Sequence, residues 1–444
     1  MSLISQQNAY LNPPRSLRSK IKFLGPGLIL SASIVGSGEL IATTLLGAKG
    51  GFIALWVILL SCLIKVAIQV EFGKQAILSG QSLMTELSSF SKHPSQVGHW
   101  SIWIIGILTF LKIMQLGGMI GGAALALSLI CPTLPTAGSL LILGAILPFF
   151  FLKNYYPLIE KTASIMVVGF TLFTIAAFVA VFYTPYAFSW GQVSSGLSFQ
   201  LSRELLFVAI GAFGITGVAS DEIIAYFYWC QEKGYARYTG ENDGSESWKN
   251  RAKGWISIMK LDAIVAMIIY TLVTAAFYLL GASILYGKES LPEGTDLIIA
   301  LAGIYTASLG EGAKMVYLIG GFFALYSSVF ATLAYWTRLF PDIFQSLGWV
   351  KKSQEQTVVR ILAFAFPIAW ITMYWVVQLP GVLVLIGGLI GSILLLVTLF
   401  ISLRFRKKSS HLGFGNSLSS KLFFWMSVSA ILGVSMYGIL QLWI

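Results

Sequence analysis

The stretch Val35-Gly36-Ser37-Gly38-Glu39 lies in the middle of an apolar run, from Lys22 to Gly51, that is long enough to cross a lipid bilayer. Two glycines, a serine and a carboxylate at this depth predict an interruption of the spanning helix. Unpaired backbone survives in a membrane only where it is buried in protein or lines a wet cavity. A carboxylate at the centre of a span also costs about 2.5–3.5 kcal/mol on insertion scales, so Glu39 is a candidate functional residue.

The second half of the chain contains a similar interruption. Leu205 to Cys230 is predicted to form a spanning helix that is broken by Gly214-Ile215-Thr216-Gly217 and resumes with Ser220-Asp221-Glu222. Interrupted spans in corresponding positions of two halves are typical of transporters built from inverted repeats, with the substrate at the breaks. We therefore predict a membrane transporter whose substrate binds between these two breaks.

The composition excludes a soluble protein. Hydrophobic residues make up 57% of the 444 residues and charged residues 11%, which indicates a single polytopic membrane domain. The formal net charge of +11 comes from basic residues that cluster in short loops, where they set orientation, so we expect neither a nucleic-acid partner nor an obligatory protein partner. Residues 1–21 are predicted to be a cytoplasmic leader because they lack the apolar core and cleavage site of a signal peptide.

Hydropathy predicts an all-α protein with eleven spans in one domain, 22–443. The spans are placed at about 22–48, 51–77, 101–130, 136–152, 162–184, 204–231, 253–285, 313–339, 358–377, 380–403 and 421–443. Spans within 22–184 and 204–403 are expected to form two five-helix repeats of opposite orientation, with 421–443 as an additional helix. The distribution of Lys and Arg places the N-terminus inside and the C-terminus outside a cytoplasmic membrane. The segment from Tyr286 to Gly312 is then expected to be a solvated outer loop.

A small set of ionisable residues falls at membrane depth: Glu39, Lys65, Lys112, Asp221, Glu222, Lys260 and Asp262. Lys260 and Asp262 lie near the inner end of span 7, where a structural ion pair or a snorkelling lysine is expected. Asp221 and Glu222 fit two roles equally, as caps of a helix N-terminus or as functional groups. The roles of Lys65 and Lys112 stay open.

Backbone carbonyls, carboxylates and the hydroxyls of Ser37 and Thr216 form an all-oxygen environment at the breaks, which suits hard cations such as Mg²⁺, Ca²⁺ or Mn²⁺. A protonated organic amine or amino acid is the alternative substrate. We expect no cofactor beyond the transported cation, with H⁺ or Na⁺ as coupling ions. An enzyme is the least expected class, because no nucleophile and base pair lies at a suitable depth.

Four segments resemble the NRAMP family of divalent-metal transporters, and together they extend over nearly the whole chain. They are Gly25-Pro26-Gly27 with the residues up to Ser31, Gly121 to Leu127, Asp262 to Ala276, and Ser327 to Ala334. The resemblance implies an eleven-helix, LeuT-like 5+5 fold and alternating access around spans 1 and 6.

The ligand positions depart from the family pattern. Gly36-Ser37-Gly38-Glu39 stands where the family has Asp-Pro-Gly-Asn, and Val218 stands where it has a methionine. Ala219-Ser220 stands at the family's Pro-His position, and Gln115 and Gly118 replace an acidic pair that is associated with proton movement. Because the soft thioether is absent, the pattern is closer to that of NRAMP-related magnesium transporters.

The departures together suggest a rebuilt cation site. We expect it to consist of Glu39, Ser37, the carbonyls near Gly36 and Ile215, Thr216, and one or both of Asp221 and Glu222, partly through water. Four further residues are candidates for coupling or gating: Gln115, Ser220, Lys260 and Asp262.

Overall fold

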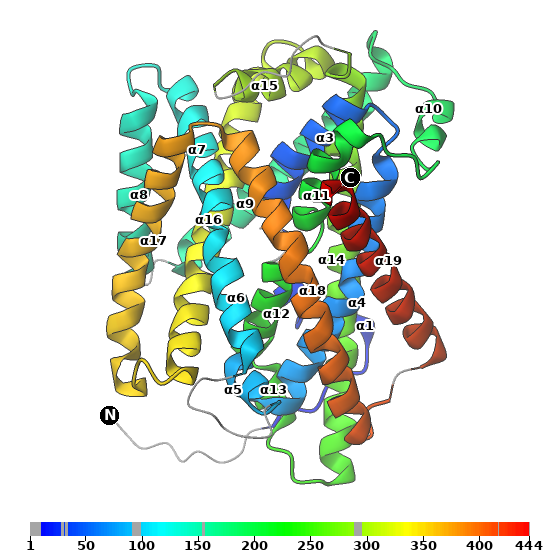
Figure 1. Ribbon diagram of the computed structural model, residues 1–444, viewed down its shortest axis with the longest axis vertical. Coiled ribbons are helices and arrows are strands. Elements are labelled where there is room, and N and C mark those ends of the chain that lie inside the picture. The colour runs from blue at the N-terminus through cyan, green and yellow to red at the C-terminus, as the bar shows by residue number, and fades with distance from the viewer. Residues whose placement is uncertain are drawn as a thin grey trace.

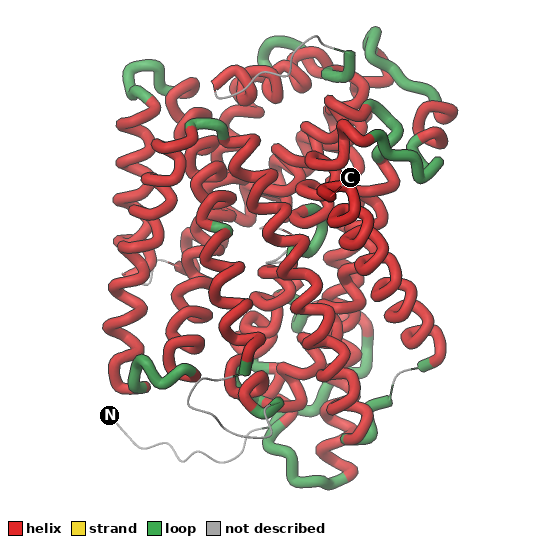
Figure 2. The backbone as a smooth tube through the Cα atoms, viewed as in Figure 1, coloured by secondary structure: helices red, strands yellow, loops and turns green. Residues whose placement is uncertain are grey.

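The computed structural model describes residues 10–27, 31, 34–90, 99–152, 156–287, 295–415 and 417–443. In these residues the secondary structure is entirely helical (Figures 1 and 2). Eight helical segments of the described chain are long and apolar enough to cross a membrane, and three shorter apolar helices accompany them. The protein is therefore a multi-pass membrane protein, as the hydropathy predicts.

The helices follow one another in the order α1 (Leu17–Ile21), π-helix η1 (Val35–Thr43), α3 (Thr44–Gly50), α4 (Leu55–Ser79), α5 (Leu83–Ser88), α6 (Trp100–Leu111), α7 (Ile113–Ile130), α8 (Thr136–Leu152), α9 (Tyr156–Ala180), α10 (Trp190–Ser195), α11 (Leu206–Ile215), α12 (Ser220–Glu232), α13 (Tyr235–Thr239), α14 (Glu246–Ile284), α15 (Thr295–Leu309), α16 (Ala313–Ser346), α17 (Glu355–Val377), α18 (Pro380–His411) and α19 (Leu418–Trp443). Short 3₁₀ turns lie at η2 (Val181–Tyr183), η3 (Arg203–Leu205) and η4 (Lys352–Gln354).

The predicted third span, 101–130, is interrupted in the structure. Helix α6 ends at Leu111, α7 begins at Ile113, and Lys112 between them has ψ near 2°, outside the helical range. Hydropathy averaged over a window did not reveal this joint. The joint places a buried lysine inside this predicted span.

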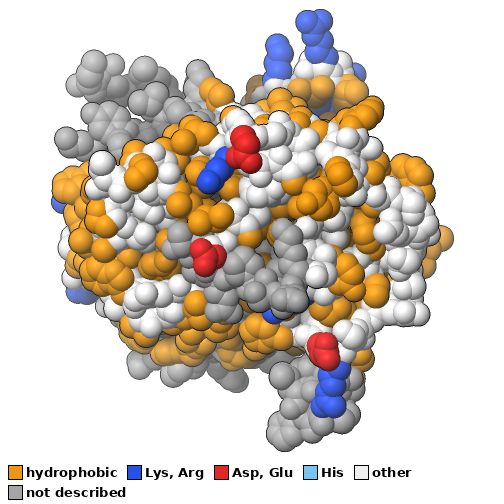
Figure 3. Space-filling view, turned by 90° about the horizontal axis from the view of Figure 1, so that it is seen from above, with side chains coloured by type: hydrophobic (Ala, Val, Ile, Leu, Met, Phe, Trp, Pro, Cys, Tyr) orange, Lys and Arg blue, Asp and Glu red, His pale blue; other side chains and the backbone are white. Residues whose placement is uncertain are grey.

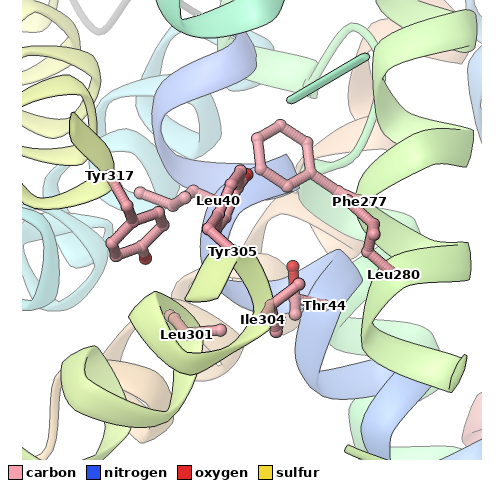
Figure 4. Close-up of a pocket in the computed structure, with 8 residues that line it drawn as sticks. All are labelled: Leu40, Thr44, Phe277, Leu280, Leu301, Ile304, Tyr305 and Tyr317. Carbon is pink, nitrogen blue, oxygen red and sulfur yellow. The ribbon is translucent and has the colours of Figure 1, made fainter. Parts of the chain in front are cut away.

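The predicted solvated loop from Tyr286 to Gly312 is wrong for its second half, which forms helix α15. One face of α15 is buried through Leu297, Ile298, Leu301 and Tyr305, so the segment packs on the bundle. Between α15, α14, α16 and the first span lies a narrow crevice (Figure 4). It is too narrow for a water molecule, and it is lined by Leu40, Thr44, Phe277, Leu280, Leu301, Ile304, Tyr305 and Tyr317.

The first span is not unwound at Val35–Glu39, as the sequence suggested, because this stretch belongs to the π-helix η1. A π-helix carries i→i+5 hydrogen bonds and occurs frequently at functional sites. The hydroxyls of Thr43 and Thr44 donate to the carbonyls of Gly38 and Glu39, five residues earlier, at 3.1 and 3.3 Å. These side chains add hydrogen bonds to two carbonyls of the widened turn, which remains helical.

The two glycines of η1 allow close contact with neighbouring helices. A Cβ at Gly36 would overlap the carbonyl oxygen of Ala324 on α16, and a Cβ at Gly38 would lie 2.7 Å from the carbonyl oxygen of Ile215. The first span therefore touches the end of α11 directly. The two predicted interruptions meet at this contact.

Candidate functional site

The predicted break in the second half is present between α11 and α12. The backbone leaves the helix at Thr216 and returns to it at Ser220. Gly217 adopts a φ of +63°, a left-handed conformation that favours glycine, and a Cβ there would lie 2.8 Å from the Cα of Cys62. The break leaves the Gly217 amide and the last carbonyls of α11 without helical partners.

The carboxylate of Glu39 links three elements at this break. Its Oε1 accepts hydrogen bonds from the Gly217 amide at 3.0 Å and from the Thr274 hydroxyl on α14 at 2.9 Å. The side chain is fully buried, and within the described structure Oε2 has no hydrogen-bond partner. A buried carboxylate oxygen without a donor is costly unless it binds another group.

Lys65 on α4 binds the end of α11. Its Nζ donates to the Phe213 carbonyl and, at 3.0 Å, to the Thr216 carbonyl. The Ser61 hydroxyl, one helical turn earlier, lies 3.0 and 2.9 Å from the same two oxygens. The Thr216 carbonyl is therefore already bound by an ammonium group, and the Thr216 hydroxyl, the predicted ligand, donates to the Ala212 carbonyl at 2.8 Å.

Lys112, at the joint between α6 and α7, forms an ion pair with Asp221 in the first turn of α12. Both side chains are buried, and Lys112 is fully so. Glu222 accepts a hydrogen bond from the Ala219 amide at 2.9 Å, which is the geometry of an N-terminal cap. As a whole residue, Glu222 is half-buried.

Two of the predicted coupling residues attach α7 and α12 to α18. The Ser220 hydroxyl donates to the Gly391 carbonyl at 2.8 Å, and a Cβ at Gly387 would overlap the Cβ of Gln115. The side chain of Ser37 lies outside the described part of the structure. In the described residues, no three Asp, Glu, His or Cys side chains are grouped closely enough to hold a metal ion.

Asp262 on α14 holds the inner start of the first span. Its carboxylate accepts hydrogen bonds from the amides of Gly25 at 2.8 Å and Gly27 at 2.5 Å. The expected ion pair with Lys260 is not among those of the described residues, so the carboxylate serves backbone amides instead. Lys233, directly after α12, donates a hydrogen bond to the Leu24 carbonyl at 3.0 Å.

We predict that Asp262→Asn opens this inner end, because an amide replaces a carboxylate that accepts two backbone hydrogen bonds. The residue to be labelled is Cys230, which is buried and whose thiol is close enough to interact electrostatically with the Asp262 carboxylate. Maleimide labelling of Cys230, followed by peptide mass spectrometry, should become about tenfold faster, since hydrogen bonds to charged groups contribute ~1.5–3 kcal/mol each. Asp243→Asn, at an exposed loop carboxylate, is the control, and equal rates in both variants would contradict the prediction.

The sequence left the role of Lys65 open, and two other site residues, Ser61 and Thr274, were not recognised from it. Ser61 and Lys65 are four residues apart on one face of an apolar helix, and this polar pair was a readable signal. Thr274 gave no such signal, since a threonine in an apolar helix usually bonds its own backbone, as it also does here to Tyr270.

An all-helical membrane protein with a broken central helix and buried charges at the break has the architecture of secondary transporters. The chain belongs to the family described as natural resistance-associated macrophage protein-like (Nramp), whose model matches residues 27–441. The resemblance noted in the sequence is thereby confirmed.

Alignments with individual curated relatives cover a smaller part of the chain than the family model does. A divalent metal cation transporter MntH of Staphylococcus aureus (strain bovine RF122 / ET3-1) is 24% identical over 278 residues, which is 61% of this chain and 57% of the relative. A second MntH, from strain JH9, is 23% identical over the same shares. The chain thus matches little more than half the length of these curated relatives.

Solved structures show the same fold. The manganese transporter of Eremococcus coleocola aligns with a TM-score of 0.59 at 15% identity, over 99% of this chain and 98% of that chain. MhsT in complex with L-phenylalanine aligns with a TM-score of 0.58 at 13% identity, over 94% of this chain and 98% of that chain. Mhp1, a nucleobase-cation-symport-1 family transporter, aligns with a TM-score of 0.54 at 15% identity, over 99% of this chain and 95% of that chain. The predicted LeuT-like, all-α fold is confirmed.

Proposed function

We propose that the protein is a secondary transporter that moves a divalent cation across the cytoplasmic membrane by alternating access. The observation that carries the proposal is the buried Glu39 carboxylate, with its unpartnered Oε2, at the contact between η1 and the break after α11. The chain belongs to the Nramp family, and its relatives in Staphylococcus are named divalent metal cation transporters. Oxygen ligands favour a hard ion such as Mg²⁺ or Mn²⁺ over a soft one.

Glu39 and Glu222 are the two carboxylates at the breaks that form no ion pair in the described structure. We assign them, with the carbonyls near Gly36 and Ile215 and with water, as the primary ligands of the transported ion. Magnesium usually keeps several waters, so a few direct ligands are sufficient. Asp221 would join the site after release from Lys112, and Thr216 would contribute through its hydroxyl; no cofactor is required.

The distribution of basic residues supports a proposed orientation in the membrane. At the end of the molecule with α5 and α13, the described loops and helix ends carry Lys233, Arg237, Lys253, Arg338, Lys351, Lys352, Arg404, Lys407 and Lys408 (Figure 1). The opposite end, with α15, shows scattered charges among apolar and uncharged side chains (Figure 3). We place the basic end in the cytoplasm, with the N-terminus inside and the C-terminus outside. The division into repeats, 22–184 and 204–403, stays a prediction.

A small organic cation is the second candidate, and the charge balance favours it. Three carboxylates (Glu39, Asp221, Glu222) and two ammonium groups (Lys65, Lys112) leave a formal charge of 2 − 3 = −1 at the breaks. One protonated amine would neutralise this charge, whereas a divalent ion would overcompensate it. This candidate therefore rests on the charge balance at the breaks.

The test is uptake into proteoliposomes that hold the purified protein, with Mg²⁺, Mn²⁺, Ca²⁺ and Cd²⁺ offered separately. We expect uptake of Mg²⁺ or Mn²⁺, and a decrease of about tenfold or more in Glu39→Gln, because a charge-assisted contact contributes ~1.5–3 kcal/mol. Glu241→Gln, the same change at an exposed loop residue, is the matched control.

Equal uptake by Glu39→Gln and wild type would show that Glu39 is not a ligand of the transported ion. If no metal moves and none binds, the metal proposal is wrong. Counterflow of radiolabelled amines and amino acids, with the same two variants, would then test the second candidate.

A further inference from the structure

Lys65 is a fully buried cation that the proposed transport site does not use. Its Nζ contacts the carbonyls of Phe213 and Thr216 and lies 4.9 Å from the centre of the Phe213 ring. Among the described residues it forms no ion pair with a carboxylate, although Glu222 and Glu39 lie within electrostatic range. Its direct ligands are therefore neutral oxygens.

These oxygens are the kind that bind a free cation. The C-terminal end of a helix carries a partial negative charge, and the end of α11 at Ile215 and Thr216 is buried, which limits screening by water. The Phe213 and Thr216 carbonyls both accept hydrogen bonds from the ammonium group, and the Ser61 hydroxyl lies 3.0 and 2.9 Å from the same two oxygens. In secondary transporters, half-helix C-terminal ends and unwound carbonyls are where coupling sodium ions or protons are held.

We propose that Lys65 is a tethered cation that permanently fills a monovalent-cation site at the end of α11. The protein therefore needs no sodium or potassium ion at this position, and the break between α11 and α12 is held together by the chain itself. The inference goes beyond the proposed function and holds whichever solute is carried.

The experiment measures thermal unfolding of the purified full chain by tryptophan fluorescence, in choline, sodium or potassium chloride at equal ionic strength and without metal. Wild type should unfold at the same temperature in all three salts. Lys65→Ala should unfold at a lower temperature in choline, and saturating sodium or potassium should raise its midpoint by about 3–5 °C, since a ligand that binds the folded state stabilises it.

Lys65→Met is the matched control, because its side chain fills the same space without a charge and leaves no room for an ion. It should be destabilised to a similar extent and should not respond to sodium or potassium. Lys65→Arg keeps the charge and should be as insensitive to salt as wild type, and this variant is informative even where Lys65→Ala does not fold.

Two outcomes would overturn the inference. The first is saturable stabilisation of wild type or Lys65→Arg by sodium or potassium. The second is a folded, monodisperse Lys65→Ala whose midpoint is the same in choline, sodium and potassium. Since metal uptake is not measured, a failure of the divalent-cation proposal would leave these readouts unchanged.

Discussion

Lys112→Met should prevent most of the protein from reaching a stable fold. The substitution leaves Asp221 as an unpaired carboxylate in a buried site, and breaking a buried ion pair by removing one partner typically costs about 3–5 kcal/mol. This is a large share of the ~5–15 kcal/mol that stabilises a typical folded domain. The yield of monodisperse protein and the unfolding midpoint would both show the loss.

The double variant Lys112→Met/Asp221→Asn should recover most of that loss, because it leaves no unpaired charge. Lys249→Met is the control, since it breaks the exposed pair with Glu246 on α14 and should cost less than about 0.5 kcal/mol. If the double variant is no more stable than Lys112→Met, the pair is not energetically coupled. This result would contradict the structural role we assign to it.

The double variant also separates the two roles that the sequence left open for Asp221. Transport restored together with folding would make the carboxylate a structural group that positions α12. Folding restored without transport would make Asp221 a ligand of the carried ion. The same test does not apply to Glu222. Its carboxylate accepts a hydrogen bond from the Ala219 amide and forms no ion pair with a lysine in the described structure.

Hydropathy was sufficient to predict the spanning helices, because each needs a long apolar run. Helices α4, α8, α17 and α18 begin at or within a few residues of their predicted starts. The break after α11 was also predictable, since glycines and polar residues interrupt a continuous apolar segment. The interruption at Lys112 was not, because a single lysine barely changes an average over the whole span.

The π-helix η1 shows why the local conformation of the first span could not be predicted. Gly36-Ser37-Gly38-Glu39 fits both an unwound turn and a widened helix, and the choice depends on where the freed carbonyls find donors. The hydroxyls of Thr43 and Thr44 supply them from the next turn. The partners of Lys65 were equally hidden, because Phe213 is 148 residues away in the sequence.

The contact between α11 and α18 depends on glycine at several positions. A Cβ built at Gly214 would overlap the carbonyl oxygen of Gly388, and a Cβ at Gly388 would overlap the carbonyl oxygen of Gly211. Small residues let helix backbones approach closely in membranes, where packing rather than the hydrophobic effect holds helices together. The Ser392 hydroxyl, bonded to the Ile210 carbonyl at 3.1 Å, adds a polar link along the same contact.

Gly214→Ala should therefore be among the most damaging small substitutions in the chain. The new methyl meets backbone atoms that cannot rotate away, so α11 and α18 must separate at a cost of about 1–3 kcal/mol or more. The separation would also displace Ile215 and Thr216, so cation binding should be lost along with stability. Gly169→Ala on α9 is the matched control: its Cβ meets nothing within 4 Å, and it should stabilise the helix by ~0.5–1 kcal/mol. Equal unfolding midpoints for the two variants would show that α11 and α18 are not held by this close backbone contact.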